Sequence, residues 1–224
     1  FKMERMRGVV VKKPIVYGSM SFYQGKKADE HNSHKWACFV TGVNGEDVST
    51  FIKKVVFQLH PSFQNPSRVF DRPPYEVHES GWGEFEIMIQ IHFHDPREKR
   101  IDIFHMLQLY PKQPGVSQST KKPVINDHYD EIIFQDPFPD FYQRLTAGTG
   151  IAPDQDLLNN PFHVEIMQHF QTHNDSAVLR QLEDAYSYIK QEAEEMREKL
   201  KKLESETQTL RQELREEEKK LRDG

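Results

Sequence analysis

The sequence predicts a mainly β fold, an immunoglobulin-like antiparallel β-sandwich, followed by a long α-helical coiled coil. Three observations predict it: residues 85–93 alternate apolar and polar side chains, other short β-like runs are separated by turn residues, and a heptad repeat fills the last 49 residues. We expect a sandwich domain over residues 1–147, a partly disordered connector over 148–175 and a coiled coil over 176–224.

The sandwich is predicted from strands of period two. Odd positions of 85–93 are Phe, Ile, Ile, Ile and Phe, and the even positions between them are Glu, Met, Gln and His. That pattern buries one face of a strand. Residues 51–59 alternate in a similar way, and further β-like runs cover 9–17, 36–41, 75–79, 101–110 and 129–134. About seven short strands with no helical pattern between them favour a sandwich. Residues 136–145 follow as one short closing helix.

The tail carries a 3-4 heptad repeat that no Gly or Pro interrupts before Gly224. The predicted seam positions with apolar side chains are Leu179, Leu182, Tyr186, Ile189, Ala193, Met196, Leu200, Leu203, Leu210, Leu214 and Leu221. Thr207 and Glu217 interrupt the seam. A single helix cannot bury such a stripe, so we expect either a homodimer or a coiled coil with another subunit.

Composition excludes several classes of protein. The 224 residues include 30 Lys and Arg against 35 Asp and Glu, which argues against a generally basic nucleic-acid binder. One cysteine, Cys38, excludes a disulfide framework and is expected to be a buried core thiol in a reducing compartment. No apolar run approaches the roughly 20 residues of a membrane helix, and the N-terminus lacks an apolar signal core.

The sequence favours neither an enzyme nor a cofactor site. It contains no Gly-x-Ser-x-Gly elbow, no Gly-x-x-x-x-Gly-Lys loop and no Gly-x-Gly-x-x-Gly. His92 and His94 share one face of a strand, Asp95 follows them, and His105 lies on a later strand. Two such histidines have metal-ligand geometry, but no third ligand is fixed by spacing, so a polar sheet face is favoured over a metal site.

The most informative residues lie in three separate loops. His34 and Trp36 open one strand, His60, Ser62 and Phe63 follow another, and the run Gly81-Trp82-Gly83-Glu84-Phe85 opens a third. Loops of a sandwich cluster at its two ends, so these residues are able to form one pocket. Its aromatic, His and hydroxyl groups suit a flat, neutral ligand with an amide-like centre. The alternative is that Phe63 and Trp82 only cover the core.

These loop motifs resemble the YEATS family. The resemblance rests on Leu59-His60-x-Ser62-Phe63, Pro73-Pro74-Tyr75-Glu76-Val77 and Glu79-Ser80-Gly81-Trp82-Gly83-Glu84-Phe85, in that order, and covers roughly residues 7–147. The Gly-Trp-Gly-Glu-Phe form and the C-terminal coiled coil resemble the branch shared by Swr-type chromatin remodellers and Tip/NuA-type histone acetyltransferase complexes.

The resemblance implies a nuclear, non-enzymatic reader of acetyl- or crotonyl-lysine in histone tails, histone H3 in particular. Phe63 and Trp82 would sandwich the acyl amide, and Ser62 with the Trp82 backbone N–H would hydrogen-bond it. His34, His60 and Phe85 would line the slot, and Gly81 and Gly83 would allow close approach. The implied partners are subunits of chromatin-remodelling and acetyltransferase complexes, with no membrane.

Two departures qualify the resemblance. Phe63 stands where close branch members tend to have Tyr, and residues 101–110 do not reproduce the acidic residue with which some relatives hold a histone arginine. A structural assembly subunit with a weak or vestigial pocket is therefore the alternative function.

Overall fold

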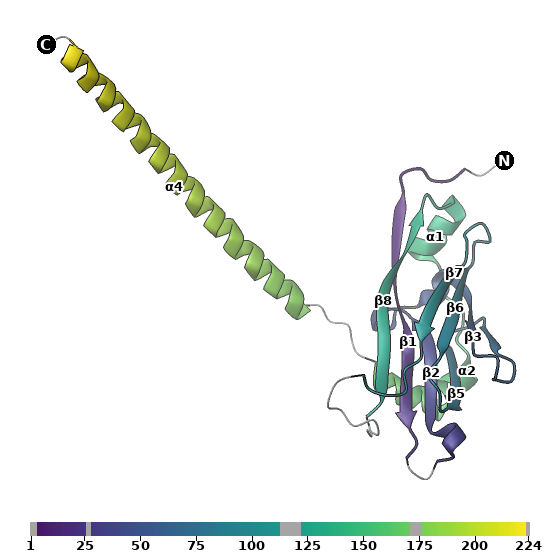
Figure 1. The fold of residues 1–224 in the computed structure, drawn as a ribbon. Coiled ribbons are helices and arrows are strands. Elements are labelled where there is room, and N and C mark those ends of the chain that lie inside the picture. The colour runs from purple at the N-terminus through teal and green to yellow at the C-terminus, as the bar shows by residue number, and fades with distance from the viewer. Residues whose placement is uncertain (1–3, 26–27, 113–121, 171–175, 223–224) are drawn as a thin grey trace. The chain divides into compact units, whose positions relative to one another are not determined.

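The computed structural model describes residues 4–25, 28–112, 122–170 and 176–222. The chain divides into two compact units, residues 1–172 and residues 173–224. The first unit is a sandwich with short helices, and the second is one long helix (Figure 1).

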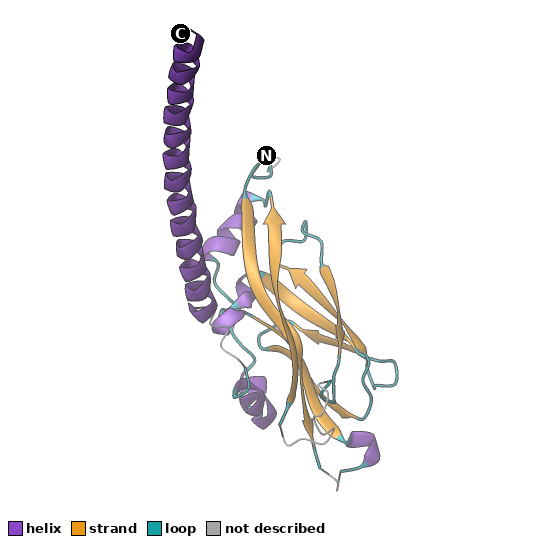
Figure 2. Ribbon diagram, turned by 60° about the vertical axis from the view of Figure 1, so that its left-hand side comes forward, coloured by secondary structure: helices purple, strands orange, loops and turns teal. Residues whose placement is uncertain are grey.

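The first unit is built from two antiparallel four-stranded sheets, which confirms the predicted sandwich (Figure 2). The strand order in sheet A is β5 (Tyr75–Gly81), β2 (His34–Thr41), β1 (Val10–Tyr23) and β8 (Val124–Gln135). The strand order in sheet B is β4 (Ser67–Phe70), β3 (Ile52–Gln58), β6 (Glu86–Phe93) and β7 (Ile101–Met106). The loops after β3 and β5 are therefore brought to one end of the sandwich.

The apolar face of β6 forms the centre of the core. Ile87, Ile89 and Ile91 are fully buried between the sheets, as the alternation of residues 85–93 predicts. Cys38 is also fully buried, and burial raises the pKa of its thiol well above the ordinary value. The strand β4 was not predicted from the sequence, because its four residues are too few to show an alternation.

Short helical segments connect the strands. Three 3₁₀ turns, Glu30–Asn32, Val43–Gly45 and Val48–Thr50, flank β2 and precede β3. The predicted closing helix is observed as α1 (Pro139–Ala147), with a proline at its first position where the missing N–H costs nothing.

Residues 148–170, which we call the belt, pack on the outer face of sheet A. They include α2 (Gln155–Leu158) and α3 (Pro161–Met167). Ile166 is fully buried against β1 and β2, and the ring of Phe170 lies 4.7 Å from that of Phe39. The backbone N–H of Ile151 donates to Ser49 Oγ at 2.7 Å. The described part of the expected connector thus differs from a free linker, because its scattered apolar residues cover an apolar sheet face. Residues 171–175 lie outside the described residues.

A buried carboxylate also anchors the belt. Glu76 on β5 accepts hydrogen bonds from His163 on α3 and from His78. At the surface, Lys35 pairs with Glu165, and its ammonium lies 4.7 Å from the centre of the Phe162 ring. Polar and apolar contacts therefore both contribute to holding α3 on the sheet.

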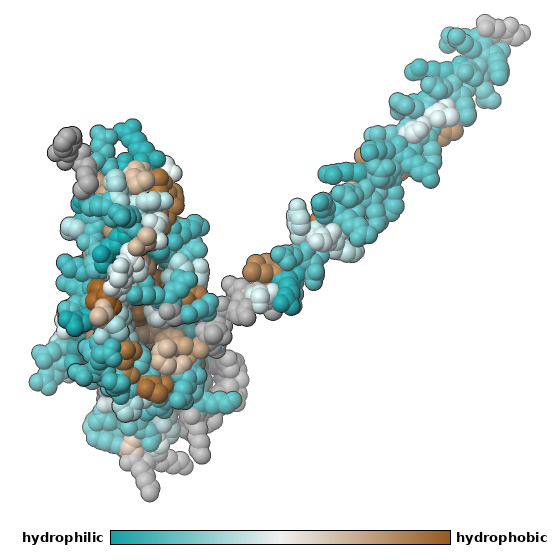
Figure 3. Space-filling view, turned by 180° about the vertical axis from the view of Figure 1, so that it is seen from behind, coloured by the Kyte–Doolittle hydropathy of each residue, from teal (hydrophilic) through white to brown (hydrophobic). Residues whose placement is uncertain are grey.

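The second unit is α4 (Ser176–Arg222), a 47-residue helix of about 70 Å at ~1.5 Å per residue. The large apolar seam residues predicted from the heptads are 56–84% exposed on it, and they recur along an otherwise hydrophilic surface (Figure 3). Among the described residues, no helix is long and apolar enough to cross a membrane.

Candidate ligand pocket

Three loops at one end of the sandwich surround a pocket of about 540 Å³. The residues that line it are His31, His60, Ser62, Phe63, Ser80, Gly81, Trp82, Gly83, Glu84 and Phe85. Seven of the eight residues predicted from the loop motifs are in this set. The eighth, His34, is not.

Aromatic side chains connect the pocket to the core. Phe63 and Phe85 lie 5.4 Å apart between ring centres. Both rings meet the buried indole of Trp36 edge-on, at 5.9 Å and 5.7 Å. This packing holds one face of the pocket rigid, since buried aromatic pairs gain energy in such geometry. Trp36 was expected at the start of a strand, but its supporting role beneath the pocket was not predicted from the sequence.

Trp82 differs from Phe63 in exposure. Its side chain is 63% exposed, because it follows the last residue of β5 and no core group covers it. A Cβ added at Gly83 would meet no atom within 4 Å, whereas one added at Gly81 would lie 3.7 Å from Trp36 Nε1 and 3.9 Å from Phe63 Cζ. The pocket is therefore open beside Gly83 and more confined beside Gly81.

Ser62 and His60 form the polar element of the pocket. His60 Nδ1 lies 2.9 Å from Ser62 Oγ and accepts the backbone N–H of Ser62 at 3.2 Å. Because Nδ1 is an acceptor, the neutral ring carries its proton on Nε2. The serine hydroxyl then donates to Nδ1 and keeps its lone pairs for another donor.

Glu84 fixes the loop that follows β5. Its carboxylate accepts backbone N–H groups of Leu109 at 2.8 Å and of Tyr110 at 3.2 Å. The N–H of Leu107 also donates to the carbonyl of Phe85 at 2.9 Å. Glu84 is part of the motif quoted for the family resemblance, but nothing in its local pattern indicates these partners, which lie 25 residues away.

His34 lies behind the pocket. It is 1% exposed, pairs with Gly81 across β2 and β5, and packs its ring 5.0 Å from Tyr110. Burial lowers the pKa of its imidazole, and the Glu84 charge opposes that shift in part. The family resemblance implied that His34 lines the slot. The structure instead places it behind the pocket, because His34 begins a strand and its side chain points into the sandwich. His31, three residues earlier, is at the pocket instead.

Two of the histidines that suggested a metal site, His94 and His105, form hydrogen bonds to groups that are not metal ligands. His94 Nε2 lies 3.1 Å from the carbonyl of Ser49, and His105 Nε2 lies 2.9 Å from Ser19 Oγ. Desolvation, assisted by nearby His128, lowers the pKa of His105 to about 4. Within the described ranges, no three or more His, Cys, Asp or Glu side chains are grouped to hold a metal ion.

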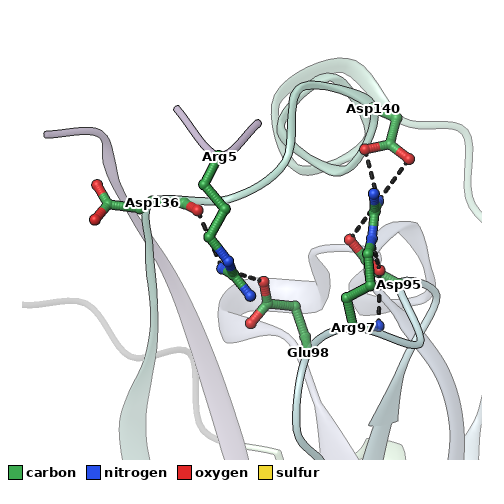
Figure 4. Close-up of polar contacts among 6 residues, drawn as sticks. All are labelled: Arg5, Asp95, Arg97, Glu98, Asp136 and Asp140. Atoms are coloured by element: carbon green, nitrogen blue, oxygen red, sulfur yellow. Dashed lines mark hydrogen bonds and ion pairs between the residues drawn. The ribbon is translucent and has the colours of Figure 1, made fainter. Parts of the chain in front are cut away.

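Asp95, the remaining candidate ligand, belongs to an ion-pair network (Figure 4). Arg97 binds both carboxylate oxygens of Asp95 at 2.7 Å and also contacts Asp140 at the start of α1. Arg5 bridges Glu98 and the carbonyl of Asp136 nearby. These contacts fasten the β6–β7 loop to α1 and to the N-terminal segment, so Asp95 has a structural role.

A β-sandwich whose end loops form a pocket lined by aromatic side chains and a serine hydroxyl has the form of a ligand-binding module. The model of the YEATS family matches residues 31–111. Transcription initiation factor TFIID subunit 14b of Arabidopsis thaliana is 38% identical over 94% of this chain and 85% of that protein. The chain therefore belongs to the YEATS family, a non-enzymatic family.

Further relatives agree with this assignment. A protein AF-9 homolog of Eremothecium gossypii is 34% identical over 88% of this chain and 94% of its own length. The crystal structure of the Yaf9 YEATS domain bound to H3K27ac aligns with a TM-score of 0.56 at 36% identity, covering 64% of this chain and 98% of that one. The Yaf9 YEATS domain recognizing an H3K122suc peptide aligns with a TM-score of 0.53 at 36% identity, with the same coverage.

Proposed function

We propose that this protein reads acylated lysine in histone tails, histone H3 in particular, within nuclear chromatin complexes. The observation that carries the proposal is that one pocket gathers Phe63, Trp82 and the Ser62–His60 pair. Relatives whose structures contain acetylated or succinylated H3 peptides support it.

The aromatic groups select an acylated over an unmodified lysine. Acylation removes the charge of the lysine, so the strongly hydrated ammonium disappears. The neutral planar amide then lies between the Phe63 ring and the exposed face of Trp82, where such stacking contributes about 0.5–1.5 kcal/mol beyond area burial. A cation–π attraction between Trp82 and the unmodified ammonium competes, but desolvation of the charge outweighs it in a narrow slot.

The polar groups orient the amide. Ser62 Oγ donates to His60 Nδ1, so its lone pairs accept the amide N–H of the ligand. The backbone N–H of Trp82 donates to the acyl carbonyl. Both polar atoms of the amide are then paired, which offsets the loss of their hydrogen bonds to water.

The helix α4 supports a second role in assembly. Ten large apolar seam residues, from Leu179 to Leu221, are exposed along it, and an unpartnered heptad stripe is stabilised by another helix. We propose a homodimer or a coiled coil with a subunit of a chromatin-remodelling or acetyltransferase complex. An assembly subunit with a weak pocket is the second candidate function, and the exposed seam is the observation that favours it.

Calorimetric titration of the full chain with H3 peptides centred on Lys27 tests the proposal. The peptide would be unmodified, acetylated or crotonylated at that lysine. We expect the acylated peptides to bind at least tenfold more tightly than the unmodified one. Equal affinities across the series would reject the reader function and leave the assembly role.

A further inference from the structure

A second cavity lies on the outer face of sheet A, under the belt, and is distinct from the pocket between the loops. Its volume is about 310 Å³, close to the lower bound for small-ligand sites. Its apolar lining includes Phe39 and Tyr75 from the sheet and Ile151, Leu158, Met167 and Phe170 from the belt. A space of this size accepts one large side chain with its neighbour, but not a helix.

The charged residues at this cavity are all acidic. Glu46, Asp47 and Glu76 line it, and no Lys or Arg is among the described residues that do. Glu76 is buried and already bound by His163 and His78. Glu46 and Asp47 are exposed, and neither forms a salt bridge within the described ranges. Asp47 Oδ1 accepts the backbone N–H of Ser49 at 2.9 Å. Among the described residues, therefore, two carboxylates with no cationic partner lie beside an apolar cavity.

We infer that this cavity docks a short segment of a partner protein, which inserts one large apolar side chain and places a Lys or Arg beside Glu46 and Asp47. Charge complementarity decides the occupant. An apolar side chain alone leaves both carboxylates without a cation, and an acidic segment is repelled by both of them. A second copy of α4 is too large for the space.

The belt forms one wall of the cavity and the sheet forms the opposite wall. Ile151, Leu158 and Met167 belong to the belt, while Phe39 and Tyr75 belong to the sheet, so an inserted side chain contacts both. A ligand that binds only the closed arrangement stabilises that arrangement. The belt also precedes α4 in the chain. A partner held by α4 is thereby tethered to this unit, which favours a weak second contact.

Methionine methyl NMR on the full chain tests the inference. The sequence has seven methionines. Met167 lines the cavity, and Met88 and Met106 on sheet B are remote reporters. The probes are the blocked dipeptides acetyl-Phe-Lys-amide, acetyl-Phe-Glu-amide and acetyl-Ala-Lys-amide. We expect Phe-Lys to shift the Met167 methyl saturably and at least threefold more tightly than Phe-Glu, and Ala-Lys to cause no saturable shift.

Two variants and a control sharpen the result. Glu46→Gln should weaken Phe-Lys binding about two- to fivefold, as expected for an exposed charge pair. Glu86→Gln, an exposed glutamate on sheet B, should not change it. Leu158→Trp should fill the cavity and abolish the Met167 shift, with the buried Met20 methyl reporting an intact fold.

Three outcomes of the probe titrations would overturn the inference. They are no saturable Met167 shift up to about 5 mM probe, equal affinities for Phe-Lys and Phe-Glu, and shifts confined to Met88 and Met106. A Met167 shift that follows protein concentration without probe would instead assign the cavity to a second copy of this chain, and would equally reject the inference.

Discussion

Oε1 of Glu76 on β5 lies 2.6 Å from Nδ1 of His163 on α3 and 2.8 Å from Nε2 of His78. Glu76 is 3% exposed, so water does not replace these contacts when the side chain is removed. Loss of hydrogen bonds to a buried charge costs about 1.5–3 kcal/mol. We therefore expect Glu76→Ala to lower the free energy of unfolding by about 2–3 kcal/mol, measured by urea denaturation.

The matched control for that substitution is Glu165→Ala on α3. Glu165 pairs with Lys35 where both side chains are more than a third exposed, and exposed pairs contribute about 0–1 kcal/mol. Faster amide exchange in α3 should accompany Glu76→Ala and not the control. Equal losses of stability in the two variants would show that Glu76 does not anchor the belt.

Trp82→Ala should abolish acyl-dependent peptide binding while changing the stability of the fold little. The side chain is 63% exposed and follows β5, so its removal leaves no cavity in the core. Phe104→Ala is the control, because Phe104 is also 63% exposed but lies on sheet B outside the pocket. Calorimetry with an acetylated H3 peptide and thermal unfolding give the two measurements. Retained affinity in Trp82→Ala would contradict the aromatic slot.

Phe63→Ala should weaken the same binding and also destabilise the fold. The ring of Phe63 packs against Trp36 and Phe85, so its loss removes buried contacts as well as the wall of the slot. A variant that bound as well as the wild type would leave Phe63 with the purely covering role that the sequence analysis kept open.

The two glycines beside Trp82 should differ in their effect on acyl chain length. We expect crotonyl-lysine to bind at least as well as acetyl-lysine, because the pocket is open beside Gly83. Gly81→Ala brings a methyl within 4 Å of Trp36 and Phe63 and should weaken crotonyl binding more than acetyl binding. Gly83→Ala, which meets no atom, should weaken both by less than about twofold. Rejection of crotonyl by the wild type would indicate a closed slot.

His105 should make folding stability depend on pH. Its pKa in the folded chain is about 4, below the ~6.5 of an unfolded histidine, so the unfolded chain binds the extra proton as pH falls below 6.5. The contribution of His105 to the free energy of unfolding is therefore fully present above pH 6.5 and is lost progressively as the pH falls toward 4. Between pH 7.5 and 5.0 this loss is about 2 kcal/mol.

The variant His105→Gln tests this pH dependence. Urea unfolding at both pH values should show a pH-induced loss about 2 kcal/mol smaller than in the wild type. Phe104→Ala, which changes an exposed residue of the same strand and removes no titratable group, is the control and should retain the wild-type slope. The same slope in His105→Gln and the wild type would reject the assignment.

Local pattern predicted the strands and most of the pocket, because both depend on short-range sequence. The alternation of residues 85–93 fixes which face of β6 is buried, and turn-flanked motifs place Ser62, Phe63 and Trp82 in loops that a sandwich brings to one end. The order of the loops along the chain was enough to expect that they meet.

Features that depend on contacts between distant residues were not predicted from the sequence. His34 was expected at the start of a strand, but its local sequence does not show that its side chain is buried behind Gly81, its partner on β5. Residues 162–170 were expected to form at most a short amphipathic segment, and the packing of the belt depends on a sheet face more than 100 residues earlier. Glu76 lies within a recognisable motif, but its partner His163 is 87 residues away.

Disruption of the α4 seam should separate assembly from recognition. The pair Leu200→Glu and Leu203→Glu places charges on adjacent seam positions, whereas Ser205→Glu and Gln212→Glu add the same charge on the opposite side of the heptad. Light scattering should show that the first pair loses the dimer and the second keeps it. If the wild-type chain is monomeric at high micromolar concentration, the homodimer is rejected and only a coiled coil with a helix of another subunit remains.

Affinity for peptides gives the second readout of the same variants. A single acylated lysine occupies one pocket, so its affinity should be equal in both double variants and in the wild type. A tail with two acylated lysines engages both pockets of a dimer, and the second contact is intramolecular, with a gain of up to about 10²–10⁴ where the geometry permits. Only the seam variant should lose that gain. A loss of single-site affinity in the seam variant would instead mean that the pocket itself depends on α4.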